Sequence, residues 1–201
     1  MTERALAHLS EAYPALRPLL MRVGPLEQLL PSPMAVPEAV VRVVVGQMLS
    51  RSAADSIYKR VCEAASRRSS AGSWELPPRT LRRLGLSASK ARTIAQFASE
   101  YRRNAGAVDR WKLMDAESVR QEVTAFWGMS DWSASMLSIF YFGHEDVFPA
   151  SDGTLLRALV MLQAKGYLDK SPSVQLGGPE ASPYRSYLAL YLWRLIDDGI
   201  L

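Results

Sequence analysis

Apolar residues recur at the spacing of one helix face along most of this chain, and this periodicity limits the fold more than any other feature. After Pro37, for example, the apolar side chains of Val40, Val44 and Met48 follow one another at intervals of four residues, as on one side of an α-helix. The alternating pattern that marks a β-hairpin is missing, and the single Asp-Gly pair, at Asp152, is not flanked by alternating apolar runs. We therefore expect an all-α fold.

The composition is typical of a folded globular protein. Of the 201 residues, 48% are hydrophobic and 22% are charged, which is sufficient for one large domain or for two lobes that share a core. No apolar run approaches the roughly 20 residues that cross a bilayer, and the N-terminal segment lacks the apolar stretch of a signal peptide. We therefore expect a cytoplasmic protein that does not bind a membrane. Nothing in the sequence indicates a coiled coil or a sheet edge for dimerisation, so we also expect a monomer.

Few residues are of the kinds that bind transition metals. Cys62 is the only cysteine, which excludes an internal disulfide and any four-cysteine zinc or iron–sulfur site within the chain. His8 and His144 are far apart in the sequence and lack the spacing of metal ligands. We therefore predict no metal site.

Charge is distributed unevenly along the chain. Residues 51–120 contain 15 Lys and Arg against 7 Asp and Glu, whereas residues 121–201 contain 5 against 9. A basic segment of this kind can form a phosphate-binding face. On charge alone, solvated helix faces are the favoured explanation of the same arginines, so charge does not identify a partner.

Two neighbouring blocks, FWGMSDWSASM and VFPASDGTLLRAL, together resemble the helix-hairpin-helix DNA glycosylases. That superfamily has a glycine-rich hairpin followed by a Gly/Pro…Asp element, and the matching residues here are Gly128, then Pro149 and Asp152. Other blocks resemble the start of the base-flipping helix (VVVGQMLSRSAADSI), the next helical pair (LGLSASKARTIAQFASEY) and the C-terminal helix (PYRSYLALYLWRL). The blocks occur in the family's order and cover about residues 37–197.

This resemblance implies a two-lobed helical fold with a DNA-binding cleft between the lobes. Residues 1–201 would form a single glycosylase domain, with the helix-hairpin-helix motif at about residues 119–141 and without the N-terminal β-rich domain that some relatives carry. Within the superfamily, the chain is most similar to the branch of 3-methyladenine DNA glycosylase II.

The expected reaction follows from that branch. Trp132 occupies the position at which lyase-competent relatives have a lysine, and iron–sulfur relatives need four C-terminal cysteines, none of which occurs after Cys62. Without the lysine there is no amine to attack the sugar. The resemblance thus implies a monofunctional enzyme of base excision repair. It would flip alkylated purines out of double-stranded DNA and hydrolyse their N-glycosidic bond.

Asp152 is the candidate catalytic residue. A carboxylate beside the sugar stabilises an oxocarbenium-like transition state and helps to orient water. The alternative is that Asp152 caps the helix expected at residues 153–163, since aspartate is a favoured N-cap. The two roles are compatible.

Aromatic residues are candidates for the base pocket. Trp132 and Trp193 match aromatic positions that line this pocket in the alkylation-specific relatives, and an indole stacked on a cationic purine contributes about 0.5–2 kcal/mol. Core packing is the alternative for both tryptophans. Met136 and Gly153 stand where relatives often have further aromatic residues, so we expect a roomier pocket with a different preference.

The expected hairpin consists of Gly128, Met129 and Ser130, whose backbone amides would bind a DNA phosphate at a helix N-terminus. The resemblance also implies a possible monovalent cation at the hairpin carbonyls, and no other cofactor. Ser130 departs from the family, which usually has glycine there, and serine tolerates a positive φ poorly. Either the turn has a different geometry or the grip on DNA is weaker.

Gln47 and Met48 match the region that fills the gap left by a flipped nucleotide. Met48 also continues the apolar stripe, so core packing is the alternative. Candidate phosphate contacts are Arg51, Lys90 and Arg185. Two other functions stay open at this point: a non-catalytic module that binds damaged DNA on the same fold, and a glycosylase for deaminated or oxidised bases.

Overall fold

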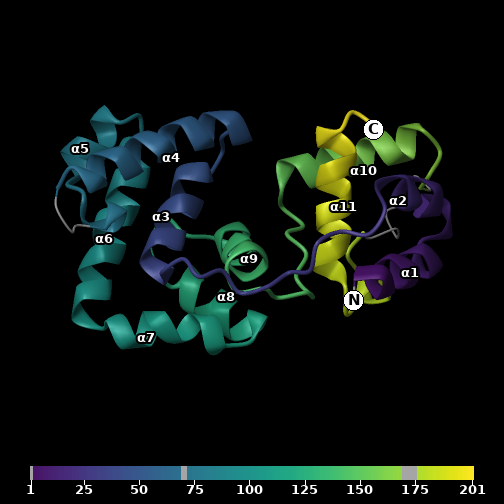
Figure 1. The fold of residues 1–201 in the computed structure, drawn as a ribbon, viewed down its shortest axis with the longest axis horizontal. Helices are drawn as coiled ribbons and strands as arrows, with labels where there is room; N and C mark the ends of the chain where they lie inside the picture. Colours follow the sequence, from purple (N-terminus) through teal and green to yellow (C-terminus); the bar gives the residue numbers. More distant parts are fainter. Residues whose placement is uncertain (1, 69–71, 169–175) are drawn as a thin grey trace. The chain divides into compact units, whose positions relative to one another are not determined.

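Helices make up the regular secondary structure throughout the described part of the chain, which is residues 2–68, 72–168 and 176–201 of a computed structural model (Figure 1). This confirms the all-α fold predicted from the sequence. The chain divides into two compact units, and we describe each by itself. The first unit is formed by Met1–Leu30 and Gly143–Leu201, and the second unit by Pro31–Phe142. That the whole chain acts as one glycosylase domain stays a prediction.

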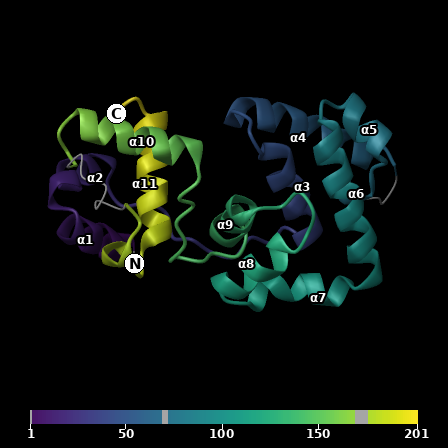
Figure 2. The same cartoon turned by 180° about the vertical axis from the view of Figure 1, so that it is seen from behind.

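The first unit joins the two ends of the chain. Its α-helices are α1 (Thr2–Ala12), α2 (Arg17–Val23), α10 (Gly153–Ala164) and α11 (Arg185–Asp197). The apolar side chains of this unit form one core that includes Leu9, Leu16, Leu20, Leu162 and Leu192. Figure 2 shows α10 beside α11, and the two helices are in direct contact.

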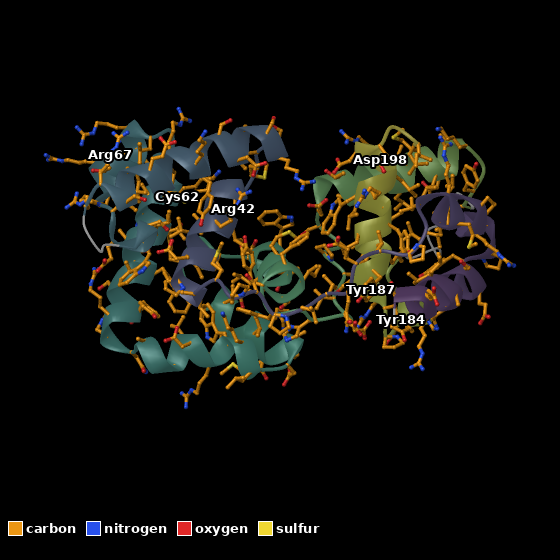
Figure 3. The ribbon with its side chains drawn as sticks, in the orientation of Figure 1. Arg42, Cys62, Arg67, Tyr184, Tyr187 and Asp198 are labelled. Carbon is orange, nitrogen blue, oxygen red and sulfur yellow. The ribbon has the colours of Figure 1, made fainter. Side chains whose placement is uncertain are left out.

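Helix α11 is buried along most of its length, which explains why apolar residues cover more than one of its faces. Its buried hydroxyl groups all have partners: Tyr187, labelled in Figure 3, donates to Glu145 Oε1 at 2.8 Å, and Tyr191 donates to the Gly24 carbonyl at 3.0 Å. Burial raises the pKa of Tyr191 to about 12. Ser186 Oγ donates to the His144 carbonyl at 2.7 Å. The bonds from Tyr187 and Ser186 fix the segment that leads to Asp152.

The second unit contains the remaining α-helices of the described chain. They are α3 (Val36–Gly46), α4 (Arg51–Ser66), α5 (Pro78–Arg83), α6 (Ala88–Arg103), α7 (Ala105–Asp109), α8 (Ala116–Thr124) and α9 (Asp131–Phe140). Helix α3 has eight buried residues and packs against α4, α6 and α9. No helix in the described ranges is long and apolar enough to span a membrane.

The apolar stripe that begins after Pro37 does not continue to Met48. Helix α3 ends at Gly46, and the Met48 side chain is 99% exposed. Core packing of Met48, one of the two alternatives from the sequence, is therefore wrong. Arg42 of α3, labelled in Figure 3, pairs with Asp55 of α4 and lies 4.8 Å from the centre of the Tyr58 ring. These contacts connect α3 and α4 on either side of the turn that contains Met48.

An aromatic cluster holds the end of α8 against α6. The ring of Phe126 lies 5.5 Å from those of Phe97 and Trp111, measured between centroids. Phe97 and Trp111 are almost fully buried. Phe126 directly precedes the turn to α9, so this cluster anchors the helix-hairpin-helix segment in the second unit.

Candidate functional site

Asp152 is the N-cap of α10. Its backbone is extended, with φ −68° and ψ 124°, and its Oδ1 accepts hydrogen bonds from the amides of Thr154 and Leu155, both at 3.0 Å. The capping role considered from the sequence is therefore confirmed. The carboxylate therefore lies at the positive end of the α10 dipole.

Trp193 holds the same carboxylate from α11. Its indole Nε1 donates to Asp152 Oδ1 at 3.0 Å, so that three N–H groups point at one oxygen atom. From the sequence, we expected the Trp193 ring to line the base pocket. The hydrogen bond to Asp152 is a second role, which belongs to the N–H group at the edge of the ring. A Cβ added to Gly153, directly after Asp152, would meet no atom within 4 Å. There is thus room beside Gly153, and the roomier base pocket stays a prediction.

Arg185, expected to contact phosphate, is held by a carboxylate. Its Nε lies 2.8 Å from Asp146 Oδ1, and its terminal nitrogen lies 3.0 Å from Oδ2. Ser182 donates to the same carboxylate at 2.8 Å. A bidentate ion pair of this kind orients the guanidinium and compensates its charge. Arg185 therefore fastens the start of α11 to the segment before Asp152, and a phosphate contact stays a prediction.

The hairpin between α8 and α9 has the geometry that the sequence motif requires at Gly128. This residue has φ +78°, and a Cβ added there would clash with Thr93 Oγ1 of α6. Met129 is 93% buried. The hairpin is therefore anchored in the second unit through a glycine that no other residue replaces without strain.

Ser130 adopts an extended backbone, with φ −123° and ψ 176°. Serine therefore causes no left-handed strain here, and the geometry of the turn does not depend on glycine at this position. Ser130 is the N-cap of α9, but its side chain makes no capping hydrogen bond. The first amides of α9 thus donate no hydrogen bond to the capping side chain, and they stay suited to an anion.

The carbonyl groups of the hairpin are partly engaged. Phe126 O accepts from the amide of Met129 at 3.1 Å, and Gly128 O accepts from Gln47 Nε2 at 3.0 Å. The monovalent cation implied by the resemblance would compete with these donors for the carbonyl oxygens. Elsewhere in the described ranges, no group of three or more His, Cys, Asp or Glu side chains could hold a metal ion.

Charged and aromatic residues near the hairpin were not singled out from the sequence. Trp127 is 45% exposed, and the Arg92 guanidinium lies 4.3 Å from the centre of its ring. Asp131, the first residue of α9, pairs with the exposed Arg120 at 3.2 Å. The signal for Asp131 was present in the sequence, since an acidic residue directly follows the expected phosphate-binding turn.

The remaining candidates also lie in the second unit. On α9, Trp132 is half-buried and Met136 is 92% buried. Gln47 and Met48 lie in the turn between α3 and α4, and Gln47 Nε2 bonds both Gly128 O and Ser133 Oγ at 3.0 Å. The structure therefore brings the insertion region and the hairpin together. Asp152, Trp193 and Arg185 form a separate group in the first unit.

Comparison with known proteins gives a consistent result. No family model matches the chain. In Schizosaccharomyces pombe, the alkylbase DNA glycosidase-like protein mag2 is 28% identical over 204 residues, which covers 96% of this chain and 93% of that protein. DNA-3-methyladenine glycosylase 1 of the same yeast is 25% identical over 173 residues, covering 78% of this chain and 71% of that protein. Of these two relatives, one is thus named as a DNA-3-methyladenine glycosylase and the other as an alkylbase DNA glycosidase-like protein.

Solved structures of such glycosylases share the fold. Mag1 of S. pombe, in complex with abasic DNA, has a TM-score of 0.75 at 22% identity, covering 96% of this chain and 97% of that one. The DNA-3-methyladenine glycosidase of Bacillus halodurans has a TM-score of 0.70 at 25% identity, covering 96% and 90%. The enzyme of Archaeoglobus fulgidus has a TM-score of 0.75 at 19% identity, covering 100% and 71%. These similarities support the resemblance found in the sequence, while the assignment to one branch stays a prediction.

Proposed function

We propose that this protein is a monofunctional DNA glycosylase of base excision repair that removes alkylated purines of the 3-methyladenine type from double-stranded DNA. The observation that carries the proposal is Asp152, a carboxylate fixed by three N–H donors at the start of α10. The similarity to glycosylases extends over 96% of the chain and 93% of the fission yeast protein mag2. It therefore includes both units.

The proposed reaction needs a fixed negative charge beside the sugar. As the bond between C1′ and the base nitrogen breaks, its electrons leave with the base and the sugar becomes cationic. Asp152 stabilises this charge electrostatically, and it is held in place before the reaction begins. Water then adds to C1′ and loses a proton, which leaves an abasic site. A cationic alkylated purine is a better leaving group than a normal base.

Binding of the flipped base is assigned to Trp132, Trp193 and Met136. Indole rings favour a cationic purine through cation–π stacking. Trp132 also explains the proposed lack of lyase activity, because the position offers no amine to form a Schiff base with the sugar.

Binding of the duplex is assigned to two parts of the second unit. The amides at Gly128, Met129 and Ser130 would hold a phosphate. The exposed Met48, next to Gln47, would fill the gap left by the flipped nucleotide and offset part of the cost of unstacking.

The test is release of bases from methylated duplex DNA, resolved by chromatography, for the wild type and for Asp152→Asn. Asparagine caps helices about as well as aspartate, so this variant removes the charge while it keeps the cap. We expect the wild type to release 3-methyladenine or 7-methylguanine. The variant should lose most of this release and still bind an abasic-site analogue. Undiminished release by Asp152→Asn would refute the catalytic assignment.

The same preparations distinguish the other functions. Release of deaminated or oxidised bases alone would indicate another substrate class, and binding of damaged DNA without any release would indicate a binding module. Treatment with borohydride during the reaction should trap no covalent complex of protein and DNA. A trapped complex would contradict the monofunctional mechanism.

A further inference from the structure

The turn between α3 and α4 has an unusual residue at its tip. The Leu49 amide donates to the Gly46 carbonyl at 3.2 Å, which closes a four-residue turn. Gln47 has φ −50° and ψ 131°, and Met48 has φ +54°. These angles are those of a type II turn, in which the third residue needs a positive φ and is usually glycine or asparagine.

Met48 is the one described residue other than glycine with a positive φ. This conformation is unfavourable for a long side chain. Met48 is also 99% exposed, so burial of apolar surface does not offset the cost of the positive φ. Backbone strain of this kind persists only where surrounding groups fix it, and it is common at binding sites.

Lys90 of α6 is the group that fixes this turn. Its Nζ donates to the Gln47 carbonyl at 2.6 Å and to the Val45 carbonyl at 2.9 Å. The Gln47 carbonyl belongs to the central peptide of the turn. A type I turn and a type II turn differ by the orientation of this one peptide. A hydrogen bond to its oxygen therefore favours one type of turn over the other.

We propose that Lys90 is a positioning residue for DNA insertion: by binding the Gln47 carbonyl, it holds the turn in the type II form that projects Met48 into solvent. This inference rests on the proposed function, in which Met48 fills the gap in the duplex. It differs from the expectation that Lys90 contacts a phosphate, because the ammonium group is directed at protein carbonyls.

The side chain of Gln47 also holds the turn in place. Gln47 Nε2 donates to the Gly128 carbonyl of the hairpin and to Oγ of the fully buried Ser133, both at 3.0 Å. The main chain of Gln47 is thus held by α6, and its side chain by the hairpin and α9. The insertion residue is thereby tied to the segment proposed to bind phosphate.

The first measurement concerns the turn itself, without DNA. In a type II turn the Gln47 Hα lies close to the Met48 amide hydrogen, whereas in a type I turn the two are farther apart. The nuclear Overhauser effect between them should be strong in the wild type and should weaken at least about twofold in Lys90→Met, because nothing then fixes the peptide. An unchanged signal would overturn the proposal.

The matched control is Lys112→Met. Lys112 Nζ also binds two carbonyl groups, those of Ser32 at 3.0 Å and Met34 at 2.6 Å, in the same unit. Like Lys90→Met, this variant removes an ammonium group that binds two carbonyl groups, but the segment it binds contains no insertion residue. The Overhauser effect between Gln47 Hα and the Met48 amide hydrogen should stay unchanged. Any weakening in Lys112→Met would measure the part that comes from a general loss of stability.

The second measurement is the affinity for a duplex with an abasic-site analogue relative to an intact duplex. Met48→Ala should lower this ratio by about tenfold. Lys90→Met should lower it by a similar factor, and it should add less than about twofold in the Met48→Ala background, because the two changes remove the same interaction. Lys112→Met should not change the ratio.

One result would overturn the positioning role of Lys90, and another would contradict the proposed function while leaving that role testable. If Lys90→Met weakens binding to both duplexes equally, adds fully to Met48→Ala and reduces the salt slope by about 0.9, then Lys90 contacts a phosphate and the positioning role is wrong. If the wild type fails to prefer the abasic duplex, the proposed function fails, while the nuclear Overhauser measurement still decides whether Lys90 fixes the turn.

Discussion

At the scale of single residues, Trp193 offers a choice between two roles that one substitution can separate. Trp193→Phe keeps an aromatic ring for stacking and removes the N–H donor to Asp152. A hydrogen bond to a charged group contributes about 1.5–3 kcal/mol, so we expect single-turnover base release to slow by about tenfold or more. Affinity for an abasic-site analogue should change little. A variant that releases bases as fast as the wild type would show that only the ring of Trp193 is used.

Asp131 places a negative charge where the hairpin is proposed to bind phosphate. The charge stabilises the first turn of α9 by about 0.3–1 kcal/mol, and Arg120 compensates it only from an exposed position. We expect Asp131→Asn to tighten binding of damaged and intact duplexes alike, by about two- to threefold at low salt, and to do so less at high salt. Titration at two salt concentrations measures this. Weaker binding by the variant would indicate that the phosphate lies elsewhere.

The sequence predicted the roles of residues that depend on neighbours along the chain better than the roles that depend on long-range contacts. Asp152 was predictable because its motif and its capping role depend on neighbours along the chain. The pairing of Arg185 with Asp146 and the binding of Lys90 to Gln47 join residues about 40 positions apart, and no local pattern marks such bonds. A Lys or Arg in a DNA-binding chain suggests a phosphate contact, and only the fold shows which carbonyl or carboxylate it reaches first.

At the scale of elements, the hairpin depends on close packing of Gly128 against α6. Gly128→Ala should lower the free energy of unfolding by about 1–3 kcal/mol, because the added methyl group meets Thr93 and the positive φ becomes strained. Gly106→Ala is the matched control. A Cβ at Gly106 in α7 meets no atom within 4 Å, and alanine there should stabilise by up to about 1 kcal/mol. Urea unfolding of both variants checks the difference, and equal effects would contradict this account of the hairpin.

The start of α11 should make the stability of the first unit depend on pH. Burial raises the pKa of Asp146, but hydrogen bonds from Arg185 and Ser182 outweigh it, so the pKa lies below its usual value of 3.8. A carboxyl group with a lowered pKa in the fold stabilises the protein at pH values above 3.8, and this contribution is lost as the pH falls through the lowered pKa. Asp146→Asn should therefore flatten the loss of stability between about pH 5 and pH 2 in urea unfolding. A parallel loss in both proteins would show that other carboxylates dominate.

The elements themselves were largely predictable, and their ends were less so. Helix α3 ends at Gly46, and glycine is costly inside a helix. The turn that follows was not predictable, since a methionine at a positive φ contradicts the local preference of its sequence. Local rules fail at such a point because long-range hydrogen bonds override them.

At the scale of the whole molecule, the basic segment 51–120 lies entirely in the second unit, which also contains the hairpin and Met48. Several of its arginines are exposed, among them Arg79, Arg82 and Arg83. The uneven charge seen in the sequence is therefore carried by one compact unit. This gives the electrostatic part of the proposed DNA binding a location that composition alone could not supply.

The salt dependence of binding tests whether that charge faces DNA. Each neutralised phosphate contributes a slope of about −0.9 to a plot of log affinity against log salt concentration. We expect a steep slope that is the same for intact and abasic duplexes, because both present the same phosphates. The preference for the abasic duplex comes from the uncharged Met48 and should not change with salt. A flat slope would place the basic residues on a face that does not contact DNA. A preference that disappears at high salt would mean that charge, rather than insertion of Met48, distinguishes damaged from intact DNA.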